Sequence, residues 1–165
     1  FRALFRQLRR RGDAKTEPDR HETPKGEPDM VDQAQAFQSL RVAQVMTPRT
    51  DINALEITEP FADVVARFTE HEHSRMPIYR DTPDQIIGMV HVFDVFVRSG
   101  ETLPPIRPVT VTTSTKSAKE LLFELLRSRR QLAIVQDDAT VVGLVTLEDL
   151  LEELVGDIRD EHDDE

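Results

Sequence analysis

The residues best suited to binding chemistry follow an apolar run, residues 141–145, at the point where a helical pattern begins. Thr146 closes the run and Asp149 comes three positions later. At a helix start, free backbone N–H groups and the positive end of the helix dipole attract anions, and the Thr146 hydroxyl can add a hydrogen bond to a phosphate. A carboxylate at Asp149 repels phosphate but suits the vicinal hydroxyls of a ribose. The pair therefore favours a nucleotide whose phosphate and sugar lie across one helix start.

The same pair has an interpretation that needs no ligand. Thr-x-x-Asp before an apolar run is also a capping arrangement, which stabilises a helix by about 1 kcal/mol. The local pattern leaves both interpretations open. The corresponding positions in the first half of the chain hold His91 and Asp94, where a histidine is more commonly an ordinary strand-end residue than part of a binding site.

An internal repeat defines the elements that must position these residues. IIGMVHVFDVF, residues 86–96, aligns with VVGLVTLEDLL, residues 141–151, so that Gly, Val and Asp coincide at an offset of 55 residues. RMPIY and QLAIV match at nearly the same offset. A single unit of this size covers its own sheet poorly, whereas two units can share one core. We predict an α/β (α+β) fold of two β-α-β-β-α repeats, packed sheet to sheet as a pseudo-two-fold pair.

Hydrophobic spacing and turn residues predict the individual elements. The predicted helices are residues 31–46, a helix opened by Pro60, one from about Phe93, one capped by residues 114–117 and one after Thr146. The predicted strands are residues 52–57, 76–79, 86–90, 109–111, 132–135 and 141–145, with turns at RDTPDQ (80–85) and DDAT (137–140). The predicted division of the chain is a basic segment and disordered linker (1–29), a lead-in helix (30–46), a first repeat (47–99), a linker (100–108), a second repeat (109–156) and an acidic tail (157–165).

Composition and charge exclude several classes of protein. The net charge is −10, with five arginines in the first twelve residues and ten acids against one arginine from Glu148 to the end. An acidic body lacks the broad basic face of a nucleic-acid binder. The absence of cysteine excludes disulfides, a thiolate nucleophile and Cys-ligated zinc. No apolar run approaches the roughly 20 residues that span a bilayer, and the chain as given is expected to be soluble.

The two charged ends each allow two interpretations. The first twelve residues form either a short basic amphipathic helix or a frayed tail, and the tail is the simpler expectation. Residues 157–165, which include His162, either bind a hard divalent cation through carboxylate oxygens or form a solvated, mobile end. A run of like charges is more often solvated, so no metal ligand is assigned there.

Several motifs together resemble a known family. VMTPRTDINAL (45–55), HSRMPIY (73–79), IIGMVHVFDVF and LAIV…VVGLVTLEDLLEELVGDIRDEHD are similar to the tandem cystathionine-β-synthase (CBS) domains of the CorC/HlyC magnesium and cobalt efflux family and of the related CNNM transporters. The resemblance covers roughly residues 31–163. Longer relatives continue into a C-terminal transporter-associated domain, and many carry a membrane domain before the CBS pair, so the chain is expected to be a fragment or a short family member.

The resemblance implies an adenine-nucleotide cleft between the two repeats. The implied nucleotide-binding residues are Thr47, Thr50, Asp51, Ile52, Ser74, Arg75, Met76, Pro77, Thr146 and Asp149, with a second, weaker site at His91 and Asp94. The first half departs from the family because HVFD lacks the lysine that relatives usually carry before the aspartate, and the DDAT turn is shorter than the family hairpin. Arg75 can equally pair with a nearby carboxylate, and Ile52 and Met76 can equally be core residues.

The resulting functional expectation is a regulatory module without enzymatic activity. It would bind ATP or AMP, with Mg²⁺ arriving through the phosphates of ATP, form a homodimer, and act on a membrane metal transporter from the cytoplasm or the inner face of the membrane. One alternative is a ligand-free module for dimerisation or docking. A nucleotide hydrolase is a third, disfavoured by the lack of a Gly-rich phosphate loop with a lysine.

Overall fold

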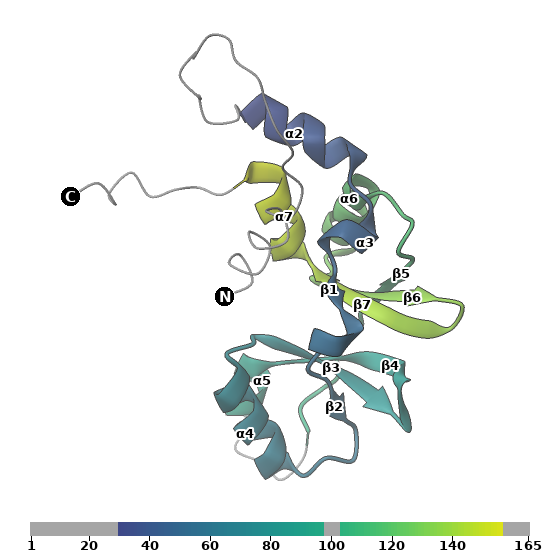
Figure 1. Ribbon diagram of the computed structural model, residues 1–165. Coiled ribbons are helices and arrows are strands. Elements are labelled where there is room, and N and C mark those ends of the chain that lie inside the picture. The colour runs from purple at the N-terminus through teal and green to yellow at the C-terminus, as the bar shows by residue number, and fades with distance from the viewer. Residues whose placement is uncertain (1–29, 98–102, 157–165) are drawn as a thin grey trace, which may run out of the picture.

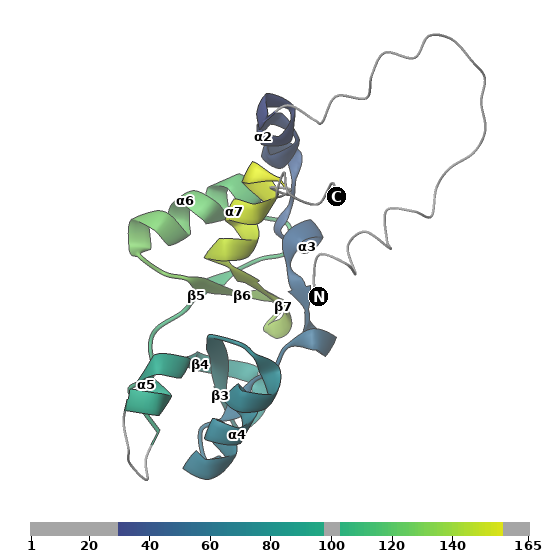
Figure 2. The same cartoon turned by 90° about the vertical axis from the view of Figure 1, so that its left-hand side faces the viewer.

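The computed structural model describes residues 30–97 and 103–156. The predictions made for residues 1–29, 98–102 and 157–165 lie outside these residues. Figure 1 shows two sheets facing each other, with helices on the outer side of each, and Figure 2 shows the same order of layers from the side. Among the described residues, no helix combines the length and the apolar character needed to cross a membrane.

The second-repeat sheet has the strand order β1-β7-β6-β5. β5 runs parallel to β6, whereas β7 is antiparallel to both β6 and β1. Side chains alternate along β6, so that Ala133 and Val135 pack beneath the helices while Leu132 and Ile134 face the other sheet. The elements are β1 (Thr47–Pro48), β5 (Thr110–Thr112), α6 (Ala118–Ser128), β6 (Leu132–Asp137), β7 (Thr140–Thr146) and α7 (Leu147–Val155).

The first-repeat sheet has the order β2-β3-β4, with β2 parallel and β4 antiparallel to β3. Its helices cover the outer face through a core that includes Val64, Phe68 and Val95. α4 carries its apolar residues at helical spacing, which is why one face is buried. The elements are β2 (Leu55–Glu56), α4 (Phe61–His71), β3 (Arg75–Arg80), β4 (Thr82–His91) and α5 (Val92–Val97).

The two sheets meet through a shared apolar layer. Met89 from β4 packs with residues of the opposite sheet, namely Leu132, Ile134, Val141 and Leu144. Burial of these side chains holds the repeats face to face. The predicted fold, two repeats packed sheet to sheet, is therefore confirmed.

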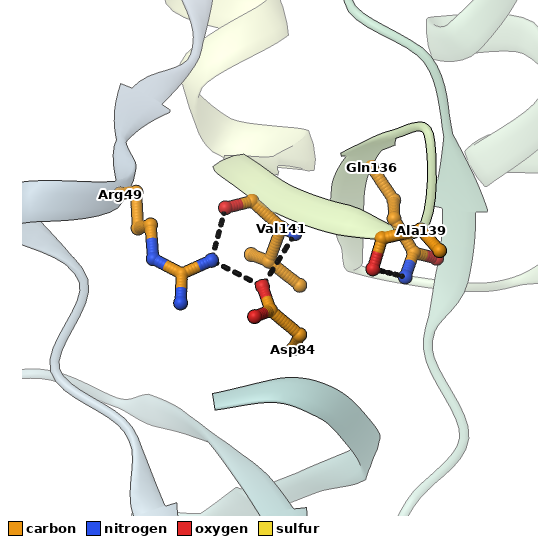
Figure 3. Close-up of polar contacts among 5 residues, drawn as sticks. All are labelled: Arg49, Asp84, Gln136, Ala139 and Val141. Carbon is orange, nitrogen blue, oxygen red and sulfur yellow. Dashed lines mark hydrogen bonds and ion pairs between the residues drawn. The ribbon is translucent and has the colours of Figure 1, made fainter. Parts of the chain in front are cut away.

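A polar contact reinforces this junction at one edge. Figure 3 shows Arg49 reaching from the 3₁₀ turn η1 (Arg49–Asp51) to Asp84 on β4 and to Val141 on β7. Arg49 Nη1 donates to an Asp84 carboxylate oxygen and to the Val141 carbonyl at 2.7 Å, and the Val141 N–H donates to the same carboxylate at 2.9 Å. These hydrogen bonds hold the pKa of Asp84 below its usual range. Asp84 thus links the edge of one sheet to the backbone of the other.

Each repeat sends a short segment onto the sheet of the other. β1 pairs with β7, placing Thr47 opposite Leu144, and the linker bridges β4, placing Arg107 opposite Met89. Both crossings pass over a glycine. A Cβ on Gly143 would lie 2.9 Å from the Thr47 carbonyl oxygen, and one on Gly88 would lie 2.6 Å from the Arg107 carbonyl oxygen. The two repeated glycines therefore make room for the two crossing backbones.

The prediction of one continuous lead-in helix over residues 31–46 is wrong. The chain forms α2 (Met30–Ser39) and α3 (Val42–Val45) instead. Between them, the backbone bonds to the segment before α6: the Val42 N–H donates to the Lys116 carbonyl at 2.9 Å, and the Leu40 carbonyl accepts from the Ala118 N–H at 2.9 Å. These long-range hydrogen bonds replace those that would continue one helix.

The predicted strand over residues 52–57 and the predicted turn over residues 80–85 also need correction. The strand is reduced to β2, because the chain first crosses from the second-repeat sheet through η1 and pairs with β3 only at its end. The turn is tighter than expected, since β4 already begins at Thr82. Asp81 takes the left-handed conformation there, with a φ of 62°.

Candidate functional site

A cavity of about 280 Å³ lies at the junction of the two repeats. Its walls come from the segment after β1, from the residues around the start of β3, and from the strand ends and helix start of the second repeat. Of the residues implied by the family resemblance, the cavity brings together Thr47, Asp51, Ile52, Ser74, Arg75, Pro77, Thr146 and Asp149.

Two of the implied residues do not reach the cavity. Met76 is fully buried in the first-repeat core, because alternation along β3 turns it away from the face that carries Arg75 and Pro77. Thr50 is exposed, and its hydroxyl bonds the Asp51 carboxylate at 3.3 Å. The alternative interpretation of Met76 as a core residue is therefore correct.

The cavity also contains residues that the sequence did not single out. Asn53 lies two positions after Asp51, and its amide nitrogen is 3.0 Å from Nε2 of His73, which precedes the SRMP motif. His73 belongs to the HSRMPIY motif, although it was not among the implied binding residues. The other unpredicted lining residues are Glu72, Leu132, Leu144 and Glu148.

Thr146 and Asp149 form a reciprocal capping box at the start of α7. The Asp149 N–H donates to the Thr146 hydroxyl oxygen at 3.2 Å, and the Thr146 N–H donates to Asp149 Oδ2 at 3.0 Å. Asp149 is buried at 8% exposure. The capping interpretation is confirmed, and the same two side chains line the cavity. The cap fixes their orientation there, so a structural role and a binding role are compatible.

Arg75 enters the cavity from the opposite repeat. Its Nη1 lies 3.0 Å from Oε1 of Glu148, the second residue of α7, and its Nη2 donates to the side-chain oxygen of Gln131. The alternative interpretation, that Arg75 pairs with a carboxylate, is thus correct in this structure. The contact connects the two repeats at the cavity.

The lining of the cavity is acidic. It contains the carboxylates of Asp51, Glu72, Glu148 and Asp149, and Arg75 is the one Lys or Arg among the described residues that line it. A polyphosphate entering this site would need a counter-charge, which a divalent cation can supply. Within the described part of the chain, no group of three or more His, Asp or Glu side chains is placed to hold a metal ion.

The second predicted site, at His91 and Asp94, has a different arrangement. Arg107 holds Asp94 through two hydrogen bonds, from Nε at 2.8 Å and from Nη2 at 2.9 Å. The Phe93 N–H donates to His91 Nδ1 at 3.2 Å, and the two rings stack. Partial burial, followed by the positive charges of Arg75 and Arg107, lowers the pKa of His91. Both predicted side chains therefore already have partners within the protein.

Comparison with known proteins agrees with this architecture. The model of the CBS domain matches twice, over residues 42–101 and 102–156. The chain belongs to the CBS-domain family. It is 36% identical over 144 residues to the magnesium and cobalt efflux protein CorC of Vibrio cholerae, a match that covers 83% of this chain and 50% of the relative. The matched region thus spans half the length of that relative.

Solved structures of CBS domains share the fold. The CBS domain of a bacterial CNNM/CorC family Mg²⁺ transporter in complex with ATP is 33% identical, with a TM-score of 0.72, and the match covers 79% of this chain and 97% of that one. A CBS-domain pair with bound AMP from Klebsiella pneumoniae is 25% identical, with a TM-score of 0.61. The match covers 72% of this chain and 100% of that one. The predicted resemblance to CorC/CNNM CBS pairs is confirmed.

Proposed function

We propose that this CBS pair is a regulatory module that binds an adenine nucleotide, ATP or AMP, in the cavity between its repeats. The observation that carries the proposal is the cavity itself. It joins the capped helix start at Thr146 and Asp149 to Ser74, Arg75 and Pro77 of the other repeat. The nucleotide complexes of similar CBS pairs support the same ligand class.

The lining residues suit the three parts of a nucleotide. Asp149 would accept hydrogen bonds from ribose hydroxyls, while the Thr146 hydroxyl can donate to a phosphate that the positive end of the α7 dipole attracts. Ile52, Pro77 and Leu132 supply apolar surface for a base. With ATP, Mg²⁺ would bridge the phosphates and reduce their repulsion by the acidic lining.

The regulatory part of the proposal concerns a larger protein. A ligand that contacts both repeats stabilises one arrangement of the two sheets over others. It shifts the populations of these arrangements only as far as its affinities for them differ. The efflux function named for the CorC relative supports a membrane metal transporter for magnesium or cobalt as the regulated partner. The module would then lie at the cytoplasmic face of the membrane.

Thermal unfolding with ATP, ADP and AMP, each with and without Mg²⁺, tests the binding proposal. Ligand at ten times its dissociation constant should stabilise the folded chain by about 1.4 kcal/mol, which raises Tm by several degrees. The shift should be absent in Asp149→Ala. No shift with any nucleotide up to millimolar concentration would contradict nucleotide binding.

A second candidate is a ligand-free module for dimerisation or docking to the transporter. Its support is the set of exposed apolar side chains on the outer helices: Phe93 and Phe96 on α5, and Phe123 and Leu126 on α6. The same surface supports a homodimer of the nucleotide-binding module. Sedimentation of the wild type and of Phe96→Glu tests whether these side chains mediate self-association, which should then be lost in the variant. Without any nucleotide-induced shift, loss of self-association would favour this second candidate.

Binding rather than catalysis is the proposed activity. The sequence has no Gly-rich phosphate loop with a lysine, which disfavours phosphate hydrolysis. Incubation of the purified chain with ATP and Mg²⁺ should release no phosphate above background. Sustained release that disappears in Asp149→Ala would instead make the protein a hydrolase.

A further inference from the structure

One ion pair spans the cavity between the two repeats. Arg75 is the first residue of β3 and Glu148 lies in the first turn of α7, with 3.0 Å between Nη1 and Oε1. Gln131, directly before β6, accepts from the other terminal nitrogen of Arg75. Arg75 and Glu148 both line the cavity beside Asp149. A ligand bound at Asp149 would therefore lie next to this pair.

The two partners of the pair differ in how firmly they are held. The Arg75 side chain is 17% exposed and the Glu148 side chain is 60% exposed. Arg75 Nε is buried and has no hydrogen-bond partner in the described structure. A guanidinium in this position remains in place and is short of acceptors, whereas an exposed carboxylate loses little when it turns into water. Glu148 is therefore the exchangeable partner.

Charge makes Arg75 the natural position for an anion. Four carboxylates line the cavity, and Arg75 is the one Lys or Arg among its described lining residues. In this structure, the charge of Arg75 is already paired with Glu148. An incoming phosphate must consequently compete with a carboxylate that belongs to the protein.

We infer that Arg75 anchors the ligand's phosphate and that Glu148 is a resident anion which this phosphate displaces. The inference rests on the proposed nucleotide-binding function and specifies which charge the site selects. A phosphate carries more charge than a carboxylate and matches the fork of the guanidinium. Glu148 thereby lowers the affinity of phosphate-bearing ligands and leaves that of a neutral nucleoside unaffected. The exchange also releases α7 from β3, so that binding removes one side-chain link between the repeats.

Calorimetric titrations of adenosine, AMP and ATP, each with excess Mg²⁺, test this exchange in three proteins. These are the wild type, Glu148→Gln and Glu152→Gln, the last being a matched control because Glu152 is exposed on the same helix outside the cavity. Glu148→Gln should bind ATP about threefold to tenfold more tightly than the wild type. The gain should be smaller for AMP and absent for adenosine, and Glu152→Gln should match the wild type throughout.

His91 provides a second readout that does not depend on affinity. Its pKa is lowered by burial and then by Arg75 and Arg107. The carboxylate of Glu148 raises this pKa, but the phosphate that displaces it brings more negative charge to Arg75, so the pKa of His91 followed by NMR should rise when ATP saturates the protein. Saturation with adenosine should leave this pKa unchanged.

The outcomes separate the inference from the function on which it rests. If the wild type binds ATP but Glu148→Gln binds it no more tightly than Glu152→Gln, the exchange is overturned and the proposed function stands. The same holds if ATP leaves the pKa of His91 unchanged. If none of the proteins binds adenosine, AMP or ATP up to millimolar concentration, the proposed function is overturned and the inference with it.

Discussion

The two repeats present equivalent helix starts in different states. In the second repeat, Thr146 and Asp149 cap α7 and line the cavity. In the first repeat, His91 stacks on Phe93, and Asp94 is held by Arg107. The same strand-to-helix design therefore supplies a candidate binding site in one repeat and an internal polar contact in the other.

The crossing segments contribute to this difference. Thr47 lies opposite Leu144 and Arg107 lies opposite Met89, and Leu144 and Met89 are themselves equivalent in the repeat. Thr47 and Arg107 thus occupy matching places. The short side chain of Thr47 lines the cavity, whereas the longer side chain of Arg107 reaches Asp94 at the start of α5. One side chain on each crossing segment thus adds to the difference between His91 and Thr146 at the two helix starts.

Filling the glycine under either crossing should have the largest effect on stability. In both Gly88→Ala and Gly143→Ala, the new Cβ would press on a backbone carbonyl of the crossing segment. Each should lower the free energy of unfolding by about 1–3 kcal/mol, as measured by urea denaturation. Gly143→Ala displaces Thr47 and should also weaken nucleotide binding, whereas Gly88→Ala should not. Unchanged stability in both variants would contradict the close crossings.

Removing the two equivalent aspartates tests the comparison directly. Asp149→Ala should weaken nucleotide binding by about tenfold to a hundredfold, because a charged acceptor for the ribose is lost. It should also lower the free energy of unfolding by about 1 kcal/mol through loss of the cap. Asp94→Ala is the matched control and should leave nucleotide affinity unchanged in the same titration. Equal losses of affinity would show that both helix starts take ligand.

The contact between Asp84, Arg49 and Val141 predicts a pH dependence at the edge of the sheets. The pKa of Asp84 is lower in the folded chain than in the unfolded chain, so its stabilising contribution is present above the unfolded value of about 3.9 and is lost as pH falls through the folded value. Urea unfolding should show the wild type more stable than Asp84→Asn at pH 6. The difference should shrink below about pH 4. A constant difference between the two proteins would contradict this assignment.

The smallest effect is expected for the pair that occupies the first helix start. Arg107 and Asp94 are partly exposed, at 51% and 27% of their side chains, so Arg107→Gln should lower the free energy of unfolding by about 1 kcal/mol or less. Arg107→Lys keeps the charge but loses the bidentate geometry, so its free energy of unfolding should lie between those of the wild type and Arg107→Gln. A loss of several kcal/mol, measured by urea denaturation, would mean that the pair is a main support of the fold.

The repeat pattern was sufficient to predict the fold, because a hydrophobic periodicity that occurs twice requires two similar sheets with matching apolar faces. It could not predict where long-range hydrogen bonds override the local preference for a helix or strand. The break in the lead-in helix depends on the contact of residues 40–43 with the segment before α6, and the shortness of β2 depends on where the chain crosses between sheets.

The candidate site was predictable only where its residues belong to recognisable motifs. Thr146, Asp149, Ser74 and Arg75 stood in such motifs, and the cavity contains them all. Glu148 went unnoticed because its role depends on Arg75, 73 positions away in the sequence. The partnership between Arg107 and Asp94 likewise depends on how the linker crosses β4, which no local pattern specifies.

The central claim, one adenine-nucleotide site in each chain at the start of α7, is tested most directly by the stoichiometry of a calorimetric titration with ATP and Mg²⁺. The account predicts one ATP per chain in the wild type and in Asp94→Ala, with much weaker binding in Asp149→Ala. Two ATP molecules per chain, or unaltered binding in Asp149→Ala, would contradict it.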